Sequence, residues 1–495
     1  MTVWIQRPHG PTIRVLTAIL LWAMGSFAIA AETKPNLIVI LTDDLGYADM
    51  GSQRQESDVR TPHLDRLATE GVRCTAGYVT APQCSPSRAG LITGRYQQRF
   101  GIDTIPDVPL PLAAVTIAER LKSAGYTSGH VGKWHLEPNA LSRKWAETNL
   151  PAHAASTPGR LIIPESDRQR YMPAAQGFDD YFSGEMNRYY ANYDLAGSDQ
   201  APSWVDDGRF RVEVQTDAAL AFLRRNQARP FFLYLNYFAP HTPLVLPENY
   251  AAGFPTDLPQ RRRAALAMMA AVDQGVGHIL AALQRHGVDD NTLIIFTSDN
   301  GAPVHRRRDS PLDEDMGGWD GSLNTPWVGE KGMLSEGGIR VPFLVRWPAG
   351  IPGGKVYHQP VSTLDIAATA AALAGIARDD QLDGVDLTPF LSGRRQDAPH
   401  AELYWRFWSQ AAVRAGRWKL LTKAGEPDRL FDLDSDYHEH RDLAQQLPEH
   451  VQALRAKLVG WTNTLEPRGL PAAGRNQQER AWYQEYFPRP TAAPR

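Results

Sequence analysis

The stretch NLIVILTDD, from Asn36 to Asp44, joins an unbroken apolar run to two carboxylates. A short apolar run without polar alternation is typical of a strand that is buried on both faces, as in a parallel sheet. Three more strands are expected in the segments YTSGHVGKWH (Tyr126–His135), PFFLYLNYF (Pro230–Phe238) and TLIIFTSDN (Thr292–Asn300). These runs predict the central strands of the fold.

Helices are expected between these strands. TPHLDRLATEG (Thr61–Gly71) has Thr61 as its N-cap, a proline in the first turn and a glycine stop. TIAERLKSAG contains Thr116 and Glu119 at the spacing of a capping box. Strands that alternate with helices predict an α/β fold, in which a large, mostly parallel (mixed) sheet is sandwiched by helices. Ligands bind such sheets at the carboxyl ends of the strands.

The N-terminus has the pattern of a targeting segment. Arg7 and Arg14 precede an apolar run, Val15–Ala30, that ends in a small-x-small cleavage pattern. We interpret residues 1–30 as a secretory signal peptide, which predicts a periplasmic or secreted protein. An uncleaved anchor helix is the alternative, although the run is short for a membrane span.

The rest of the chain predicts two further regions. Residues 31–394 carry the strand and helix pattern and form the expected catalytic domain. Residues 395–495 contain short, aromatic, alternating segments, one amphipathic helix and a polar tail, which predict a smaller antiparallel α+β subdomain with a loose C-terminus. The net charge of −3 provides no global field for nucleic acid or for a membrane, so neither is an expected partner of the mature protein.

Four of the strand ends carry polar side chains, and two of these ends are acidic. Asp43 and Asp44 follow the first strand, and Asp299 and Asn300 follow the last of the four. Carboxylates that are brought together repel each other unless a cation lies between them. Oxygen donors select calcium or magnesium rather than zinc. These four residues therefore predict one divalent cation site, for calcium or magnesium.

Cationic and imidazole side chains follow other strand ends or lie in glycine- and proline-flanked segments. They are Lys133, His135, His241 and Lys331. Beside a divalent cation they would form a pocket for a tetrahedral oxyanion, and a histidine can also give a proton to a leaving oxygen.

One of only two cysteines lies in the stretch APQCSPSRAGLITGRY (Ala81–Tyr96). Ser85 followed by Pro86 predicts an N-cap and the first turn of a helix, which places Cys84 just ahead of the helix N-terminus. From these residues alone Cys84 is a candidate nucleophilic thiol of low pKa. A disulfide with Cys74 is the structural alternative and is disfavoured in a chain this long.

The segment CSPSRAGLITGR resembles the signature of the type I, formylglycine-dependent sulfatases, which belong to the alkaline phosphatase superfamily. The resemblance extends over most of the chain. It continues through NLIVILTDDLGYADMG, GHVGKWHL, APHTP, TLIIFTSDNG and GEKGMLSEGG. It implies an alkaline-phosphatase-like fold and a sulfuric ester hydrolase, and it implies that a formylglycine-generating enzyme oxidises Cys84 to formylglycine.

The resemblance also implies roles for the residues already named. Asp43, Asp44, Asp299, Asn300 and the modified Cys84 would be calcium ligands, and Arg88 would hold the formylglycine. The set that would bind the sulfate and the leaving oxygen is Lys133, His135, His241 and Lys331. The hydrated aldehyde would be the nucleophile.

A sulfated saccharide is the expected substrate, as a polysaccharide or of the glycosaminoglycan type. The candidate contacts are Arg188, Tyr189, Arg306 and Trp319, which supply cationic and aromatic groups on expected loops. Three alternatives stay open: a phosphatase or phosphonate monoester hydrolase on the same fold, a catalytically inactive carbohydrate-binding relative, and a cysteine hydrolase that uses Cys84 with a histidine base.

Overall fold

Strand β1 (Asn36–Asp43) lies at the centre of the main sheet in this computed structural model. The structure describes residues 1–4, 34–105, 108–156, 161–304, 309–314, 318–468 and 473–487. The chain divides into two units, Met1–Lys34 and Pro35–Arg495, and the second contains every element described below. The predicted signal peptide falls almost entirely outside the described residues, so it stays a prediction.

In the described part of the chain the main sheet has eleven strands, in the order β10-β2-β9-β8-β1-β7-β3-β4-β5-β6, with β11 paired to β2. Their bounds are β2 (Val72–Tyr78), β3 (Thr127–Gly132), β4 (Asp180–Ser183), β5 (Arg188–Tyr193), β6 (Asp199–Asp206), β7 (Phe231–Pro240), β8 (Thr292–Ser298), β9 (Arg340–Arg346), β10 (Lys355–Tyr357) and β11 (Val361–Ser362). β1 pairs in parallel with β7 and β8, and β3 in parallel with β7. β9 runs antiparallel to β8 and β2, so the predicted mixed, mostly parallel sheet is confirmed.

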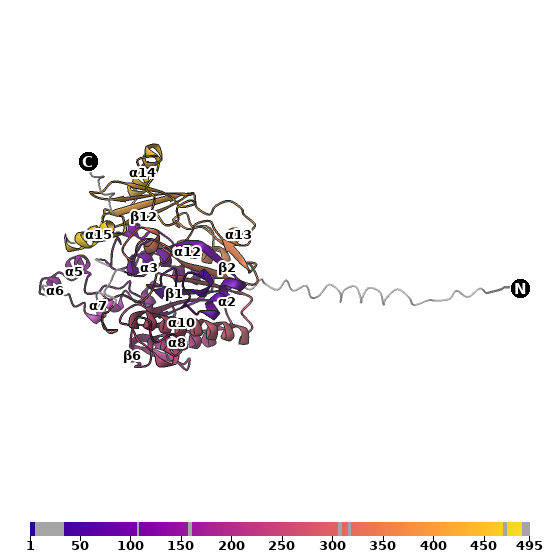
Figure 1. Cartoon of the computed structure of the whole chain (residues 1–495). Helices are drawn as coiled ribbons and strands as arrows, with labels where there is room; N and C mark the ends of the chain where they lie inside the picture. Colours follow the sequence, from indigo (N-terminus) through magenta and orange to yellow (C-terminus); the bar gives the residue numbers. More distant parts are fainter. Residues whose placement is uncertain are drawn as a thin grey trace, which may run out of the picture. The chain divides into compact units, whose positions relative to one another are not determined.

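Alternate residues of β1 enter two different hydrophobic clusters. Ile38 and Ile40 pack with residues of α2 (Pro62–Glu70), α8 (Arg211–Asn226) and α10 (Gln260–Arg285). Leu37, Val39 and Leu41 pack with residues of α3 (Cys84–Thr93), α4 (Ile117–Lys122) and α12 (Asp365–Leu373). Figure 1 shows α8 and α10 on the opposite side of β1 from α3 and α12. A strand buried on both faces therefore has no polar alternation, as its sequence predicted.

The predicted helices are present with small differences at their ends. α2 begins after Thr61, and α4 has the complete capping box of Thr116 and Glu119. α10 is long and apolar enough to cross a membrane by length and composition, but 72% of its apolar window is buried inside the protein. The shorter helical elements are η1 (Gly51–Gln53), η2 (Gln97–Phe100), α5 (Arg143–Asn149), α6 (Pro151–Ser156), α7 (Glu165–Gln169), η3 (Pro173–Gln176), α9 (Glu248–Ala251), α11 (Glu336–Ile339) and α13 (Thr388–Leu391).

The C-terminal region forms a separate antiparallel sheet, as predicted. Its strands are β12 (Glu402–Phe407), β13 (Gln410–Ala415), β14 (Trp418–Lys423) and β15 (Arg429–Asp432), and α14 (Pro448–Thr462) follows them. The expectation of a loose tail was wrong up to residue 487. α15 (Ala473–Tyr486) is helical, and Trp482, Tyr483 and Phe487 are buried in one cluster with residues of β12. The tail looked polar because only one face of α15 is apolar.

Candidate active site

Acidic groups from two neighbouring parallel strands meet at one edge of the main sheet. Asp43 is the last residue of β1, and Asp299 directly follows β8. Asp44 has a left-handed backbone, with φ of 64°, and its N–H donates to Asp299 Oδ1 over 3.2 Å. Asn300 Nδ2 donates to Asp44 Oδ1 over 2.6 Å. The structure therefore brings together the four predicted cation ligands, and the turn at Asp44 makes this possible.

Arg88, on α3, is fully buried among these carboxylates. Its Nε donates to Asp299 Oδ2 over 2.9 Å, and its Nη2 lies 3.4 Å from Asp43 Oδ2. Nη1 donates to the carbonyl of Lys133 over 3.0 Å, so the same guanidinium also fixes the turn after β3. Burial favours a lower pKa for Arg88, but Asp299 and Asp43 outweigh it and raise the pKa, which keeps the guanidinium charged.

Two buried lysines face the same carboxylates. Lys133 Nζ lies 2.7 Å from Asp43 Oδ2, and Lys331 Nζ lies 2.7 Å from Asp44 Oδ2. Burial alone would lower the pKa of each lysine, but its carboxylate partner and then Cys84 raise that pKa above the usual range. Both lysines are therefore charged in the site.

His241 presents one ring nitrogen to this cluster. Its Nε2 lies 3.7 Å from Asp44 Oδ2, and its ring stacks on Phe238 with 4.9 Å between the centroids. Nδ1 contacts the carbonyl of Thr242, which can only accept, so we place the Nδ1 proton there by this contact. Burial lowers the pKa of His241 to about 3. In this arrangement the ring is neutral at pH 7, with Nε2 directed at the site.

His135 lies two residues beyond Lys133, in a left-handed conformation with φ of 59°. Its Nδ1 is buried and has no hydrogen-bond partner among the described residues. Burial and then the positive charge of Lys133 lower the pKa of His135 to about 4. An unpaired buried nitrogen beside a lysine is available to a ligand oxygen.

Cys84 is the first residue of α3, and only 2% of its surface is exposed. The predicted N-cap at Ser85 was wrong by two residues. Gln83 is the N-cap, with φ of −144° and ψ of 151°, and the helix includes Cys84 itself. A proline at the third helical position is tolerated because the first N–H groups of a helix have no partner within it.

The Cys84 thiol lies within electrostatic range of Arg88, Lys133 and Lys331. Neither cysteine forms a disulfide, so Cys74 is a small buried residue of β2. The structure thus brings the candidate nucleophile, three cations and the acidic cluster together.

The donors at this sheet edge fit a hard divalent cation. Asp43, Asp44 and His241 offer ligand atoms within 4.8 Å of one another. Asp43 Oδ1 and Asn300 Oδ1 are buried and have no hydrogen-bond partner among the described residues. Burial and then repulsion by Asp43 raise the pKa of Asp299 in spite of Arg88. Orphaned oxygens and carboxylates that repel each other are what an oxygen-ligated cation would satisfy.

The residues predicted to contact the substrate lie in different environments. Arg188 is exposed at the start of β5, where it lines a hollow. Tyr189 and Trp319 do not fit the predicted stacking on sugar, because both are buried and present no open ring face. Tyr189 donates its hydroxyl to the carbonyl of Met186 and belongs to the core. Arg306 lies outside the described residues.

Two buried charged residues of the site have no signal in the sequence. Arg211, on α8, donates from Nη2 to the carbonyl of His241 over 2.7 Å and so fixes the histidine segment. The side chain of Asp320 lies beside that of Asp44 and helps to lower the pKa of Asp44. Arg211 begins an ordinary amphipathic helix, and Asp320 lies in a glycine-rich loop, so neither stands out by pattern.

The turn that carries Lys331 is supported by the C-terminal helix. Gly332 has φ of 98°, and a Cβ placed on it would come within 2.3 Å of the Trp482 ring. Gly332 N donates to the carbonyl of Pro82 over 2.8 Å, and its own carbonyl accepts from Gln410 over 2.9 Å. One glycine therefore links α15, the Lys331 turn and the segment that leads into Cys84.

The variant Trp482→Ala is expected to lower kcat/KM for the reaction at this site about tenfold or more, because a cavity beside Gly332 loosens the Lys331 turn. Trp461→Ala is the matched control, since Trp461 is similarly buried but belongs to the cluster around Tyr96 and α14. Steady-state kinetics and thermal unfolding are measured for both variants. If Trp482→Ala and Trp461→Ala lose the same stability and also the same activity, Trp482 has no positioning role.

A family model described as sulfatase matches residues 35–376. A second model, described as the C-terminal part of N-sulphoglucosamine sulphohydrolase, matches residues 327–464. Steryl-sulfatase of Mus musculus is 33% identical, over 94% of this chain and 90% of the relative. N-acetylgalactosamine-6-sulfatase of Mus musculus is 32% identical, over 81% of this chain and 74% of the relative.

Solved structures agree with these matches. The crystal structure of Ps i-CgsB in complex with k-i-k-neocarrahexaose has a TM-score of 0.71 and 29% identity, and covers 92% of this chain and 99% of that one. The phosphonate monoester hydrolase of Agrobacterium radiobacter has a TM-score of 0.60 at 23% identity, covers 87% of this chain and 96% of that one, and shares the fold alone. The match over most of the chain, together with the site geometry, leads to one conclusion: this chain belongs to the sulfatase family and is a sulfuric ester hydrolase.

Proposed function

We propose that this sulfatase hydrolyses sulfate esters of carbohydrates, with a formylglycine made from Cys84 as nucleophile and one calcium ion as cofactor. The placement of Cys84 at the start of α3, near three cations and an acidic cluster, carries the proposal. Relatives named N-acetylgalactosamine-6-sulfatase and a similar structure that holds k-i-k-neocarrahexaose support a sulfated saccharide as the substrate class.

Asp43, Asp44, Asp299 and Asn300 would hold the calcium ion, and the modified Cys84 would add an oxygen ligand. When bound, the cation and the hydrated aldehyde supply charge neutralisation and an attacking oxygen. Arg88 and the two lysines offset the carboxylates of Asp43, Asp44 and Asp299, so a divalent cation would add positive charge that favours an anionic ester and an ionised nucleophile.

The chain's own residues would orient the ester. Lys133 and Lys331 donate to the sulfuryl oxygens, because their ammonium groups already face the acidic cluster. His135 contacts the sulfate through its unpaired Nδ1. Nε2 of His241 is the nitrogen that is directed at the site, and it carries a lone pair in the neutral ring. It gives a proton to the leaving oxygen once the ring has taken up a second proton there, while Arg211 and Thr242 fix the segment and the ring.

Mass spectrometry of the peptide that contains Cys84 tests the nucleophile directly. Oxidation of the thiol side chain to an aldehyde lowers the residue mass by about 18 Da, because sulfur and two hydrogens are exchanged for oxygen. We expect this loss in active protein, with Cys74 unmodified in the same digest. An unmodified Cys84 thiol in fully active enzyme would instead support a cysteine hydrolase.

A substrate screen tests the ester class. Defined sulfated saccharides and 4-nitrophenyl sulfate are compared with the matched phosphate and phosphonate esters. We expect sulfate release to exceed phosphate and phosphonate turnover. A reverse preference would favour the phosphatase or phosphonate monoester hydrolase alternative, and saccharide binding without turnover would favour an inactive carbohydrate-binding protein.

Maturation and export complete the proposal. A formylglycine-generating enzyme is the proposed partner that modifies Cys84. Residues 1–30 are the proposed signal peptide, and the mature protein is periplasmic or secreted, with residues 31–394 as the catalytic domain and a C-terminal subdomain from residue 395. Edman or mass analysis of the mature N-terminus tests the cleavage after Ala30.

A further inference from the structure

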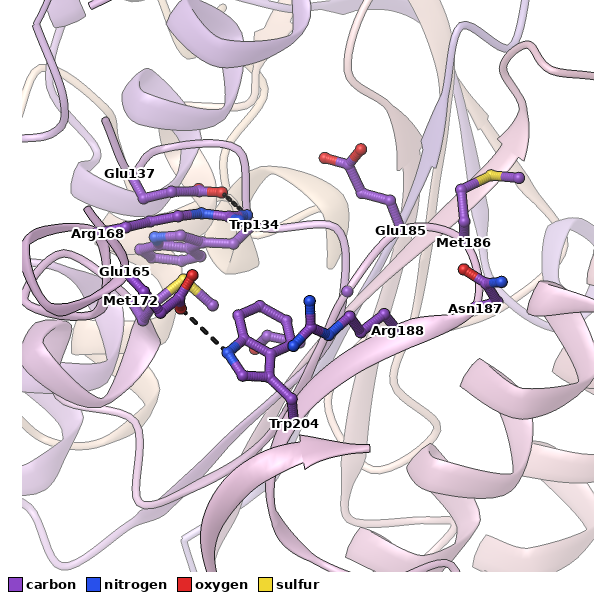
Figure 2. A pocket seen from close by; sticks show the side chains of 12 residues that line it. Trp134, Glu137, Glu165, Arg168, Met172, Glu185, Met186, Asn187, Arg188 and Trp204 are labelled. Carbon is purple, nitrogen blue, oxygen red and sulfur yellow. Dashed lines mark hydrogen bonds and ion pairs between the residues drawn. The ribbon is translucent and has the colours of Figure 1, made fainter. Parts of the chain in front are cut away.

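A hollow of about 210 Å³ lies beside the candidate active site. It adjoins the turn after β3, which carries Lys133 and His135, and the end of β4, where Ser183 pairs with Gly132. Its charged and aromatic lining consists of Trp134, Glu137, Glu165, Arg168, Glu185, Arg188 and Trp204 (Figure 2). The hollow therefore lies next to the segment that carries Lys133 and His135, and its lining residue Glu185 interacts electrostatically with both.

Arg188 supplies the available positive charge of this hollow. Its side chain is 62% exposed, and its Nε lies 3.8 Å from Asp206, whose own side chain is 85% exposed. The guanidinium carbon lies 4.9 Å from the centroid of the Trp204 ring, and Figure 2 shows the two groups side by side. Trp204 is fixed in turn, because its Nε1 donates to Glu165 over 3.1 Å. A guanidinium held on an indole face, with only a long exposed ion pair, is available to an anion.

The other cation of the hollow is already paired. Arg168 Nη2 donates to Glu137 over 2.9 Å, and the Glu137 side chain is only 8% exposed. Arg168 also lies over the Trp204 ring, at 5.6 Å from its centroid. A half-buried ion pair of this kind, with the Arg168 side chain 37% exposed, shapes the wall and offers little free charge to a ligand. The hollow thus presents one loosely paired guanidinium, that of Arg188, rather than two.

Glu185 makes the end of the hollow next to the active site negatively charged, in contrast to the positive charge of Arg188. Its carboxylate makes no hydrogen bond or ion pair with any other residue that the structure describes, yet it interacts electrostatically with Lys133 and His135. A carboxylate there accepts hydrogen bonds from hydroxyl groups and repels a second anion close to the scissile sulfate. An acidic group of a ligand is therefore favoured only at the Arg188 end.

We propose that this hollow is a subsite for the sugar next to the sulfated one. Glu185 accepts hydrogen bonds from the hydroxyl groups of that sugar. Arg188 binds its acidic substituent, which is a carboxylate or a second sulfate. The inference rests on the proposed carbohydrate sulfatase function and narrows the substrate class to acidic saccharides. A planar guanidinium matches both anions in a bidentate manner, so the chemistry is shared between the two substituents.

The test uses the full chain in its modified, calcium-loaded form, as wild type, Arg188→Gln and Arg170→Gln. Arg170 is the matched control, because its side chain is 72% exposed in the same region and it does not line the hollow. Substrates are matched sulfated disaccharides whose neighbouring sugar is glucuronic acid, glucose or glucose 6-sulfate. 4-nitrophenyl sulfate is assayed with the wild type.

We expect the wild type to prefer an acidic neighbour, and Arg188→Gln to lower the ratio of kcat/KM for acidic over neutral disaccharides about tenfold through KM. The two acidic arms show whether carboxylate or sulfate is preferred. Arg170→Gln should keep the wild-type ratio. An unchanged ratio in Arg188→Gln, or no preference in the wild type, overturns the subsite. No sulfate release from any substrate, 4-nitrophenyl sulfate included, overturns the proposed function itself.

Discussion

Replacing Cys84 with alanine is expected to reduce sulfate release by about 10⁴-fold or more while leaving the fold intact. The proposed nucleophile is removed, whereas the cations of the site stay in place. Alanine is the best helix former, and Cys84 lies within α3 as its first residue. The thermal unfolding midpoint should therefore change little, and the activity loss should appear in kcat for every sulfate ester.

Cys74→Ala is the matched control for this variant. Cys74 is the other cysteine of the chain, is fully buried in β2 and lies away from the acidic cluster. We expect Cys74→Ala to lose some stability, because a buried group is deleted, and to keep its activity. Substantial turnover by Cys84→Ala, or an equal activity loss in both variants, would contradict the assignment of the nucleophile.

Asp299→Asn is expected to lower calcium affinity about 100-fold or more and to lower activity with it. The carboxylate is a proposed cation ligand and also the main partner of Arg88, at 2.8 Å from Nη2. Loss of its charge leaves a buried guanidinium with Asp43 alone, so a stability loss of about 3 kcal/mol is also expected. The decisive readout is the calcium-dependent rise of the unfolding temperature, which needs no turnover.

Asp289→Asn separates the two effects of that change. Asp289 accepts two hydrogen bonds from the guanidinium of the buried Arg346, over 2.8 and 2.9 Å. Arg346 does not belong to the candidate active site. Both variants lose the charge of a buried arginine partner, but only Asp299→Asn should lose the calcium-dependent stabilisation. If Asp299→Asn keeps the wild-type response to calcium, Asp299 is not a ligand.

The sequence predicted the sheet and the centre of the site because both depend on local patterns. The apolar run of β1 has no polar alternation, and the packing of Ile38 and Val39 into opposite clusters explains why. Parallel strands end at one edge, so Asp43 and Asp299 could be expected to meet before any coordinate was known. The cations fit the same argument, since Lys133 directly follows β3.

Other parts of the site depend on contacts that no local pattern reveals. Tyr189 and Trp319 have aromatic rings that could stack on a sugar, but tertiary packing buries both rings. Arg211 reaches the site because α8 packs along β7. The guanidinium of Arg211 donates to the carbonyls of Phe238 and His241, which follow it in the chain by about one helix and one strand. Cys84 was placed ahead of its helix because Ser85 is the better N-cap by type, while the backbone geometry at Gln83 decided the start.

The burial of α3 bears on the order in which the chain folds and Cys84 is modified. Every residue from Cys84 to Thr93 is buried, so the folded chain offers no extended peptide around the thiol to a second enzyme. The proposed oxidation of Cys84 would therefore have to precede the folding of β1 and α3. A molecule that folds first would keep its thiol. Under this proposal, the fraction of aldehyde in purified protein would record the competition between modification and folding during synthesis.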